Sequence, residues 1–278
     1  MILNEKANTF LHNNLKREYQ VLGQGDRILY AFHGFGRSLL EWEVFLPWLG
    51  QEFTIFAFAD FFHGESEFPI NRLALSPLKK EEITAFFTAF AAENDHSDIN
   101  LMAYSSGGRT VLSLIEMQRF TINEVWLFAP DGIKVSFWNR MFTKHKLIQK
   151  LYKRIINKPD FFFKLARSLK KVKLLSPSLT YFVLSNMREK QKRQKIYNFW
   201  MVYREIIPDI KEVSQLVNEG MIRLHLIFGE EDVVIPPSIG RDFIKNLGKS
   251  ADLLELKGGH LLIDLKHLEK LKERFPLK

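Results

Sequence analysis

The chain has 278 residues and no cysteine, and apolar residues make up 46% of it. That length suits one large α/β domain with an insertion or two small domains, and the apolar share is enough for a substantial core. The lack of cysteine excludes disulfides and thiolate metal sites. No apolar run approaches the roughly 20 residues of a membrane span, and the N-terminus lacks the basic and apolar segments of a secretory signal, so we expect a cytoplasmic protein.

The formal net charge of +8 is unevenly distributed. Residues 134–205 contain 19 Lys or Arg against three acidic residues, which gives this segment a net charge of +16. Because the whole chain carries +8, the remainder carries −8. A basic segment inserted into an acidic body calls for a separate explanation.

Apolar runs alternate with helical patterns along most of the chain. After an opening hairpin within residues 1–26, with a turn at 23–26, each continuous apolar run predicts a strand that is buried on both faces. The predicted strands are 28–32, 53–59, 99–103, 125–130, 223–228 and 252–256. Helical patterns lie between them, at 39–49, from Ser76-Pro77 to about 94, after 106, at 238–247 and after 260. This alternation predicts an α/β fold with a mostly parallel twisted sheet and helices on both faces.

The alternation stops between residues 134 and 208. Basic and aromatic helical stretches replace it, with Phe161, Phe162 and Phe163 among the aromatic residues. We therefore predict a core made of residues 1–133 and 209–278, with an inserted all-helical segment at 134–208.

One stretch, Ala103-Tyr104-Ser105-Ser106-Gly107, predicts a strand that runs into a helix through a very tight turn. Such a turn exposes a serine near the positive N-terminal end of the helix, and it needs small residues two positions before and two after that serine. Ala103 and Gly107 meet this need for Ser105, whereas Ser106 would have the bulky Tyr104 two positions before it. Ser105 is therefore the candidate nucleophile.

Other polar residues also follow predicted strands. In a parallel sheet, ligands bind outside the carboxyl ends of the strands, so we expect these loops to converge in space. The loops are those of His33, Asp60, Ser105, Asp131, Asp232 and His260.

With these loops in their order and spacing, the chain resembles the α/β-hydrolase fold family over nearly its whole length. The motifs that carry the resemblance are His33-Gly34-Phe35-Gly36, Asp60 with His63-Gly64-Glu65-Ser66, Ala103 to Arg109, Gly229-Glu230-Glu231-Asp232, and Gly258-Gly259-His260. The order Ser, Asp, His along the chain is also that of the family. The sequence departs from the family pattern at Ala103, where Gly is commoner, and in the Asp60 loop, which is one residue shorter.

The chemistry of a serine nucleophile assigns the remaining roles. A hydroxyl needs a base to take its proton, and His260, beside flanking glycines, is the candidate base. Asp232 would orient His260 and stabilise its imidazolium, although Glu230 and Glu231 are neighbouring acids. The resemblance implies that the backbone N–H groups of Phe35 and Ser106 form the oxyanion hole.

The other histidines, acids and paired glycines in the sequence predict no metal site and no cofactor site. His33 and His63 are interpreted as residues that orient loops, and Asp264 as a residue on a solvated helix face. The histidine and acid spacing gives no metal site, and the paired glycines are too short for a dinucleotide motif, so no cofactor is expected.

These features predict a serine hydrolase that cleaves an ester, thioester or similar acyl bond of a small-molecule substrate. One alternative is a carbon–carbon lyase or synthase of the same fold acting on a small carboxylated substrate, because the menaquinone-pathway synthase of the family has comparable loops. A non-catalytic binding module is the other. The residues that bind the substrate and the oligomeric state are not predicted.

In the family, a helical insertion at this point usually forms a lid. Three interpretations of the basic segment remain open: aromatic residues that pack while lysines face water, a pocket for a partly apolar and anionic substrate, and weak contact with an anionic membrane surface. Nucleic acid is not an expected partner, because no binding module is recognised.

Overall fold

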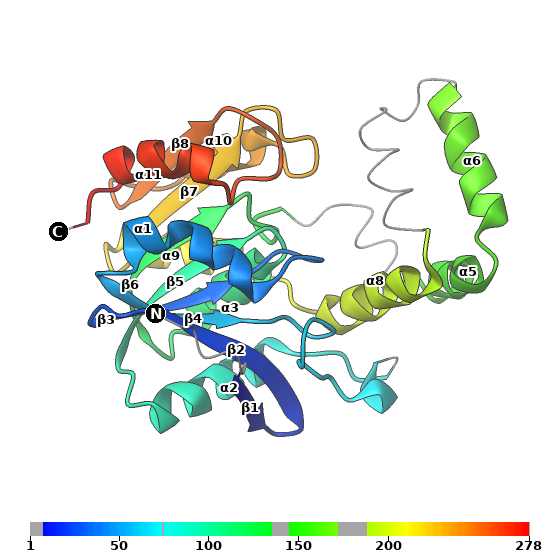
Figure 1. Cartoon of the computed structure of the whole chain (residues 1–278), viewed down its shortest axis with the longest axis horizontal. Helices are drawn as coiled ribbons and strands as arrows, with labels where there is room; N and C mark the ends of the chain where they lie inside the picture. Colours follow the sequence, from blue (N-terminus) through cyan, green and yellow to red (C-terminus); the bar gives the residue numbers. More distant parts are fainter. Residues whose placement is uncertain (1–7, 74, 135–144, 172–187, 278) are drawn as a thin grey trace. The chain divides into compact units, whose positions relative to one another are not determined.

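The computed structural model describes residues 8–73, 75–134, 145–171 and 188–277 (Figure 1). The chain divides into two compact units. The first contains residues 1–69, 78–134 and 206–278, and the second contains residues 70–77 and 135–205. Of the predicted helical insert, residues 135–144 and 172–187 lie outside the described residues.

The first unit is built on an eight-stranded sheet with the order β1-β2-β4-β3-β5-β6-β7-β8. Strands β3 to β8 are parallel, whereas β1 pairs antiparallel with β2 and β2 pairs antiparallel with β4. The predicted mostly parallel sheet is therefore confirmed. The strands are β1 (Asn8–His12), β2 (Leu15–Gly23), β3 (Arg27–Phe32), β4 (Phe53–Phe58), β5 (Asp98–Tyr104), β6 (Thr121–Phe128), β7 (Arg223–Gly229) and β8 (Ala251–Leu256).

Helices connect these strands. They are η1 (Leu39–Phe45), α1 (Leu46–Leu49), α2 (Lys80–Glu93), α3 (Gly107–Met117), α9 (Ile210–Asn218), α10 (Pro237–Ile244), η3 (Leu265–His267) and α11 (Leu268–Arg274). Helix α3 packs against both α2 and α9. Trp48 of α1 donates a hydrogen bond to the backbone oxygen of Phe275, just after α11, which ties the start of the chain to its end.

Many of the phenylalanines lie in one aromatic cluster between the sheet and α2. The rings of Phe58, Phe87 and Phe90 meet edge to face, with centroids about 5 Å apart. Tyr30 of β3 is fully buried against the same rings. Edge-to-face pairs add to the free energy of area burial, so this cluster fixes β3 and β4 beneath the loops that follow them.

The second unit contains η2 (Ile70–Arg72), α5 (Lys146–Asn157), α6 (Asp160–Lys171) and α8 (Lys190–Tyr203). Its small core is formed by Ile156 of α5 with Tyr197 and Met201 of α8. The guanidinium of Arg193 donates two hydrogen bonds to the backbone oxygen of Ile156, which holds the end of α5 against α8. None of the described helices is long and apolar enough to cross a bilayer.

Three features differ from the sequence prediction. The turn between β1 and β2 lies at Asn13 and Asn14, both in the left-handed conformation that asparagine tolerates. Residues 23–26, predicted as a turn, reverse the chain between β2 and β3. Helix α2 begins at Lys80, so Ser76-Pro77 is not its N-terminus; instead Glu82 accepts a hydrogen bond from the backbone N–H of Lys79. Helix α9, capped by Asp209, was not predicted.

Candidate active site

Ser105 lies in the tight turn between β5 and α3. Its φ of +51° is in the left-handed region, which is unfavourable for a residue with a side chain. The surrounding backbone holds it there: the N–H of Ser105 donates to Phe128, and its carbonyl accepts from Gly108 and Asp131. The turn predicted around Ser105 is therefore present in the structure.

Gly107 permits this turn for a steric reason. A Cβ on Gly107 would lie 2.4 Å from the backbone oxygen of Phe32, at the end of the neighbouring strand β3. That separation is far below van der Waals contact. Any larger residue would push the first turn of α3 away from the sheet and move Ser105 with it.

His260 and Asp232 approach Ser105 from the loops that follow β8 and β7. These parallel neighbours keep their loops together, because the N–H of Glu230 donates to Leu256 and that of Glu231 to Gly258. The Nε2 atom of His260 lies 3.0 Å from the Ser105 hydroxyl oxygen. Its Nδ1 atom lies 2.6 Å from Asp232 Oδ2. Three residues separated by up to 155 positions in the chain are thus in hydrogen-bond contact.

The hydrogen bonds determine the tautomer of His260. A carboxylate only accepts, so the proton of the neutral ring lies on Nδ1, and Nε2 is left to accept from Ser105. The Asp232 side chain is fully buried, and its Oδ1 accepts from the N–H groups of Val234 and Ile235. These two bonds fix the carboxylate that orients the imidazole.

The loop after β3 forms a turn next to Ser105. The N–H of Arg37 donates to Gly34, and Gly36 has a φ of +76°, as in a type II turn. A Cβ on Gly34 would lie 3.2 Å from Cβ of Ser105, so the turn lies directly against the serine. Phe35, the predicted oxyanion-hole residue, occupies the second position of this turn.

Two buried histidines orient this turn. His33 Nδ1 donates to the carbonyl of Gly34, and its Nε2 accepts from the N–H of Asp60. His63 Nδ1 lies 3.2 Å from the carbonyl of Phe61, and its Nε2 accepts from the N–H of Gly36 at 2.8 Å. Both rings act as acceptors at Nε2 and are therefore neutral. Neither contacts Ser105 as a base, in agreement with the sequence interpretation.

Sequence reasoning missed two further residues near the turn. Tyr104 donates from its hydroxyl to the backbone oxygen of His260 at 2.8 Å, which links β5 to the His260 loop. Glu41 is almost fully buried, and burial raises its pKa despite hydrogen bonds from Arg37 and the Gly34 backbone. Burial likewise raises the pKa of Tyr104, so the phenol stays protonated and keeps donating.

Asp131, the remaining predicted loop residue, stabilises the turn at Ser105 through both its side chain and its backbone. Its partly buried carboxylate forms an ion pair with the buried Arg109 of α3 at 2.7 Å, while its N–H donates to the backbone oxygen of Ser105. The pair joins the start of α3 to the loop after β6. Asp264 caps η3 by accepting from the N–H of Lys266 and takes no part in the site.

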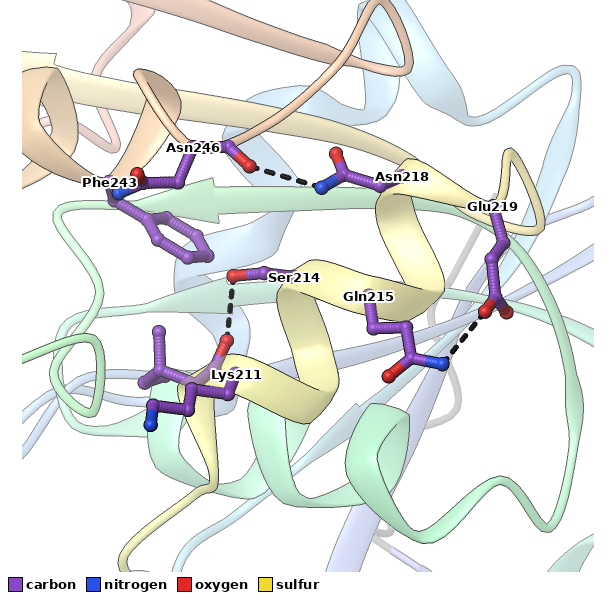
Figure 2. A pocket seen from close by; sticks show the side chains of 8 residues that line it. Lys211, Ser214, Gln215, Asn218, Glu219, Phe243 and Asn246 are labelled. Atoms are coloured by element: carbon purple, nitrogen blue, oxygen red, sulfur yellow. Dashed lines mark hydrogen bonds between the residues drawn. The ribbon is translucent and has the colours of Figure 1, made fainter.

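Other candidate sites lie apart from these residues. Among the described residues, no group of three or more His, Asp or Glu could hold a metal ion. A surface groove of about 680 Å³ lies between α9 and α10, and Ser214, Gln215 and Asn218 are among the residues that line it (Figure 2). It includes none of the residues that surround Ser105.

The arrangement at Ser105 can perform nucleophilic chemistry. A hydroxyl, a neutral imidazole and a buried carboxylate form one chain of hydrogen bonds, with the N-terminus of α3 next to the hydroxyl. The imidazole can accept the hydroxyl proton as the oxygen attacks, and the carboxylate can stabilise the resulting cation.

The chain is similar to a known protein family in sequence and to several solved structures in fold. A family model described as the alpha/beta hydrolase fold matches residues 27–266. A thermophilic esterase from Thermogutta terrifontis superposes with a TM-score of 0.64 at 13% identity, over 97% of this chain and 95% of that chain. An alpha/beta hydrolase fold protein from Burkholderia ambifaria gives 0.64 at 17% identity, over 99% of each chain. A meta-cleavage product hydrolase from Pseudomonas fluorescens gives 0.61 at 14%, over 96% and 94%. No match was found among curated proteins.

Proposed function

This chain belongs to the α/β-hydrolase fold family, and from that premise we propose that it is a serine hydrolase that cleaves an ester, thioester or similar acyl bond. One observation carries the proposal: His260 lies within hydrogen-bond distance of both the Ser105 hydroxyl and the Asp232 carboxylate. Fold membership alone supports many chemistries, so the activity is argued from this site.

In the proposed reaction, Ser105 Oγ attacks the acyl carbon while His260 Nε2 takes the hydroxyl proton. Asp232 accepts a hydrogen bond from the Nδ1–H group and stabilises the imidazolium without becoming protonated. His260 then gives its proton to the leaving alcohol or thiol, and an acyl-enzyme remains on Ser105. Water attacks this acyl-enzyme with His260 again acting as the base, and the acid product leaves.

The attack places negative charge on the carbonyl oxygen, which needs donors that are already in position. We assign these donors to the backbone N–H groups of Phe35 and Ser106. Two observations support this role: the Phe35 turn lies against Ser105, and Ser106 stands at the N-terminal end of α3. One such donor typically lowers the barrier by about 3 kcal/mol.

The substrate is proposed to be a small acyl compound with an apolar portion and a negative charge. The charge distribution supports it, because residues 134–205 carry +16 while the remainder carries −8. Such a field raises the local concentration of anionic substrates and is screened beyond about 8 Å at physiological salt. Added salt should therefore lower kcat/KM for an anionic ester, and leave that for a neutral ester of equal length nearly unchanged.

A panel of p-nitrophenyl esters of increasing chain length tests the proposed activity. We expect turnover of at least one ester, with a burst of p-nitrophenol if deacylation limits the rate. Covalent labelling by a fluorophosphonate without turnover of any ester would favour a carbon–carbon lyase of the same fold. Absence of both labelling and turnover would favour a binding module.

A further inference from the structure

Helix α5 has a wider apolar arc than its packing covers. Tyr152 and Ile156 face the second unit's core, where they pack against Tyr197 of α8. Leu147 and Leu151, four residues apart and so on one side of the helix, are 82% and 54% exposed. A helix with a single buried face would place polar residues at these two positions.

Helix α6 continues this pattern after a short connection. Its second residue, Phe161, is 72% exposed. Single exposed apolar residues are common on protein surfaces, but these three fall within residues 147–161, on two consecutive helices of one unit. We call them, together with Lys150, Arg154, Lys158 and Lys164, the basic–apolar face.

Positive charge surrounds the three apolar residues. Residues 145–171 contain nine Lys or Arg and one acid, Asp160. Lys150 and Arg154 are exposed, and neither lies within ion-pair distance of a carboxylate in the part of the chain that the structure describes. The charge of this face is therefore not neutralised within the unit, which leaves it available to an anionic partner.

We propose that the basic–apolar face docks on the surface of an anionic lipid bilayer. Leu147, Leu151 and Phe161 would enter the boundary between headgroups and acyl chains, and the cations would lie among the anionic headgroups. This is how an amphipathic helix with Lys and Arg beside an apolar edge lies in a membrane interface.

The combination of groups selects a bilayer over other anionic surfaces. A nucleic acid would satisfy the cations through its phosphates, but its backbone offers no apolar layer for two leucines and a phenylalanine. A bilayer supplies both negative headgroups and an apolar layer a few ångströms below them. The inference is independent of the proposed function, because docking requires no turnover.

Co-sedimentation of the full chain with vesicles tests the proposal. One set of vesicles is phosphatidylcholine, and the other is phosphatidylcholine mixed with phosphatidylserine. The chain should bind the mixed vesicles and not the neutral ones, and added salt should weaken the binding, because exposed charges are screened. Equal binding to both sets, or to neither, would overturn the proposal.

Two variants separate the contributions of charge and apolar contact. Each basic side chain near an anionic surface raises the partition constant about fivefold, so Lys150→Gln, Arg154→Gln and Lys158→Gln together should lower it about a hundredfold. The second variant combines Leu147→Ser, Leu151→Ser and Phe161→Ser. It should lower the partition constant at least as much, because each apolar side chain loses its burial in the interface.

Matched controls lie on the first unit. Leu11→Ser changes a leucine that is 66% exposed on β1, and Lys211→Gln with Lys249→Gln removes two exposed cations. Both controls should sediment as the wild type does. Control variants that lose as much binding as the test variants would show that general charge or apolarity, and not this face, is responsible.

Kinetics on a short, uncharged soluble ester complete the test, because the charge of residues 134–205 is proposed to act only on anionic substrates. Both test variants should keep the wild-type kcat and KM on that ester, and circular dichroism should show unchanged helix content. Variants that sediment normally but lose activity on the soluble ester would overturn membrane docking and assign the face to the substrate. Because the chain has no cysteine, a fluorophore can be attached at position 161 alone in a Phe161→Cys chain. Quenching of that fluorophore by brominated lipid would directly support insertion, and no quenching in sedimented protein would contradict it.

Discussion

His63 should matter for catalysis although it does not touch the reacting atoms. Its Nε2 accepts from the N–H of Gly36 inside the turn that presents Phe35 to Ser105. Its side chain is nearly fully buried, with 4% of the residue exposed. Replacing it with leucine would remove the acceptor and leave no ready access for water.

Two free energies set the size of the expected loss of kcat in His63→Leu. A buried N–H left without an acceptor costs about 1–3 kcal/mol. A rotation of the turn that gives the Gly36 N–H another acceptor would therefore be favoured. If the rotation withdraws the Phe35 N–H completely, the barrier rises by the worth of one oxyanion donor, about 3 kcal/mol or two orders of magnitude in rate. We therefore expect His63→Leu to lower kcat by about 10- to 100-fold and to leave KM nearly unchanged, since the donor acts mainly in the transition state.

Two comparison variants make the test specific. In His63→Gln the side-chain oxygen reaches the position of Nε2, so this variant should retain kcat within a few-fold of wild type. His96→Leu serves as the control. His96 lies just before β5, at the end of the strands away from Ser105, and it forms a hydrogen bond with the hydroxyl of buried Tyr30. It should lower stability to urea and leave kcat intact.

Steady-state kinetics on the best p-nitrophenyl ester, with urea unfolding on the same preparations, gives the result. A kcat for His63→Leu within twofold of wild type would show that His63 does not position the Phe35 turn. Equal losses in the Leu and Gln variants would show that the hydrogen-bond acceptor at position 63 is not what matters.

Three other changes test separate parts of the structure. Asp232→Asn should lower kcat by about three to four orders of magnitude, since an amide favours the wrong tautomer of His260. Glu231→Gln should keep a kcat near that of wild type. If ester kinetics show the larger loss in Glu231→Gln, the acid that orients His260 is Glu231. Gly107→Ala should destabilise the fold by about 1–3 kcal/mol in urea unfolding, because its Cβ meets a backbone oxygen; an unchanged midpoint would contradict that contact. Although Glu124 is partly buried, hydrogen bonds from His225 and Arg27 hold its pKa below its ordinary value of 4.5. The stability it contributes should be present above that value and be lost as pH falls through the lower folded pKa, and Glu124→Gln should remove this part of the acid loss.

The strands were the most predictable part of the fold. Continuous apolar runs such as 28–32 and 223–228 mark strands covered on both sides, and the structure confirms both within a residue or two. The turn at Asn13-Asn14 was not located and the start of α2 was predicted wrongly, because several nearby residues could form a turn or a helix cap there. Asn13 and Asn14 both have positive φ, as does Gly23 in the predicted turn at residues 23–26.

The candidate site was predictable where the motif itself encodes its geometry. A serine between Ala103 and Gly107 specifies a tight turn, and Ser105 has the expected positive φ. The supporting contacts were not predictable, because they join residues far apart in sequence. Neither the bond from Tyr104 to the carbonyl of His260 nor the burial of Glu41 beside Gly34 leaves a local pattern that a single sequence could reveal.

The central claim is that Ser105 is the nucleophile, and the most direct measurement is covalent labelling by a fluorophosphonate followed by mass spectrometry of the intact and digested protein. We expect one adduct per chain on the peptide that contains Ser105, no adduct in Ser105→Ala, and nearly full labelling in Ser106→Ala. Ser106 is expected to contribute only its backbone N–H, which alanine keeps. Full labelling of Ser105→Ala together with loss of labelling in Ser106→Ala would contradict the assignment.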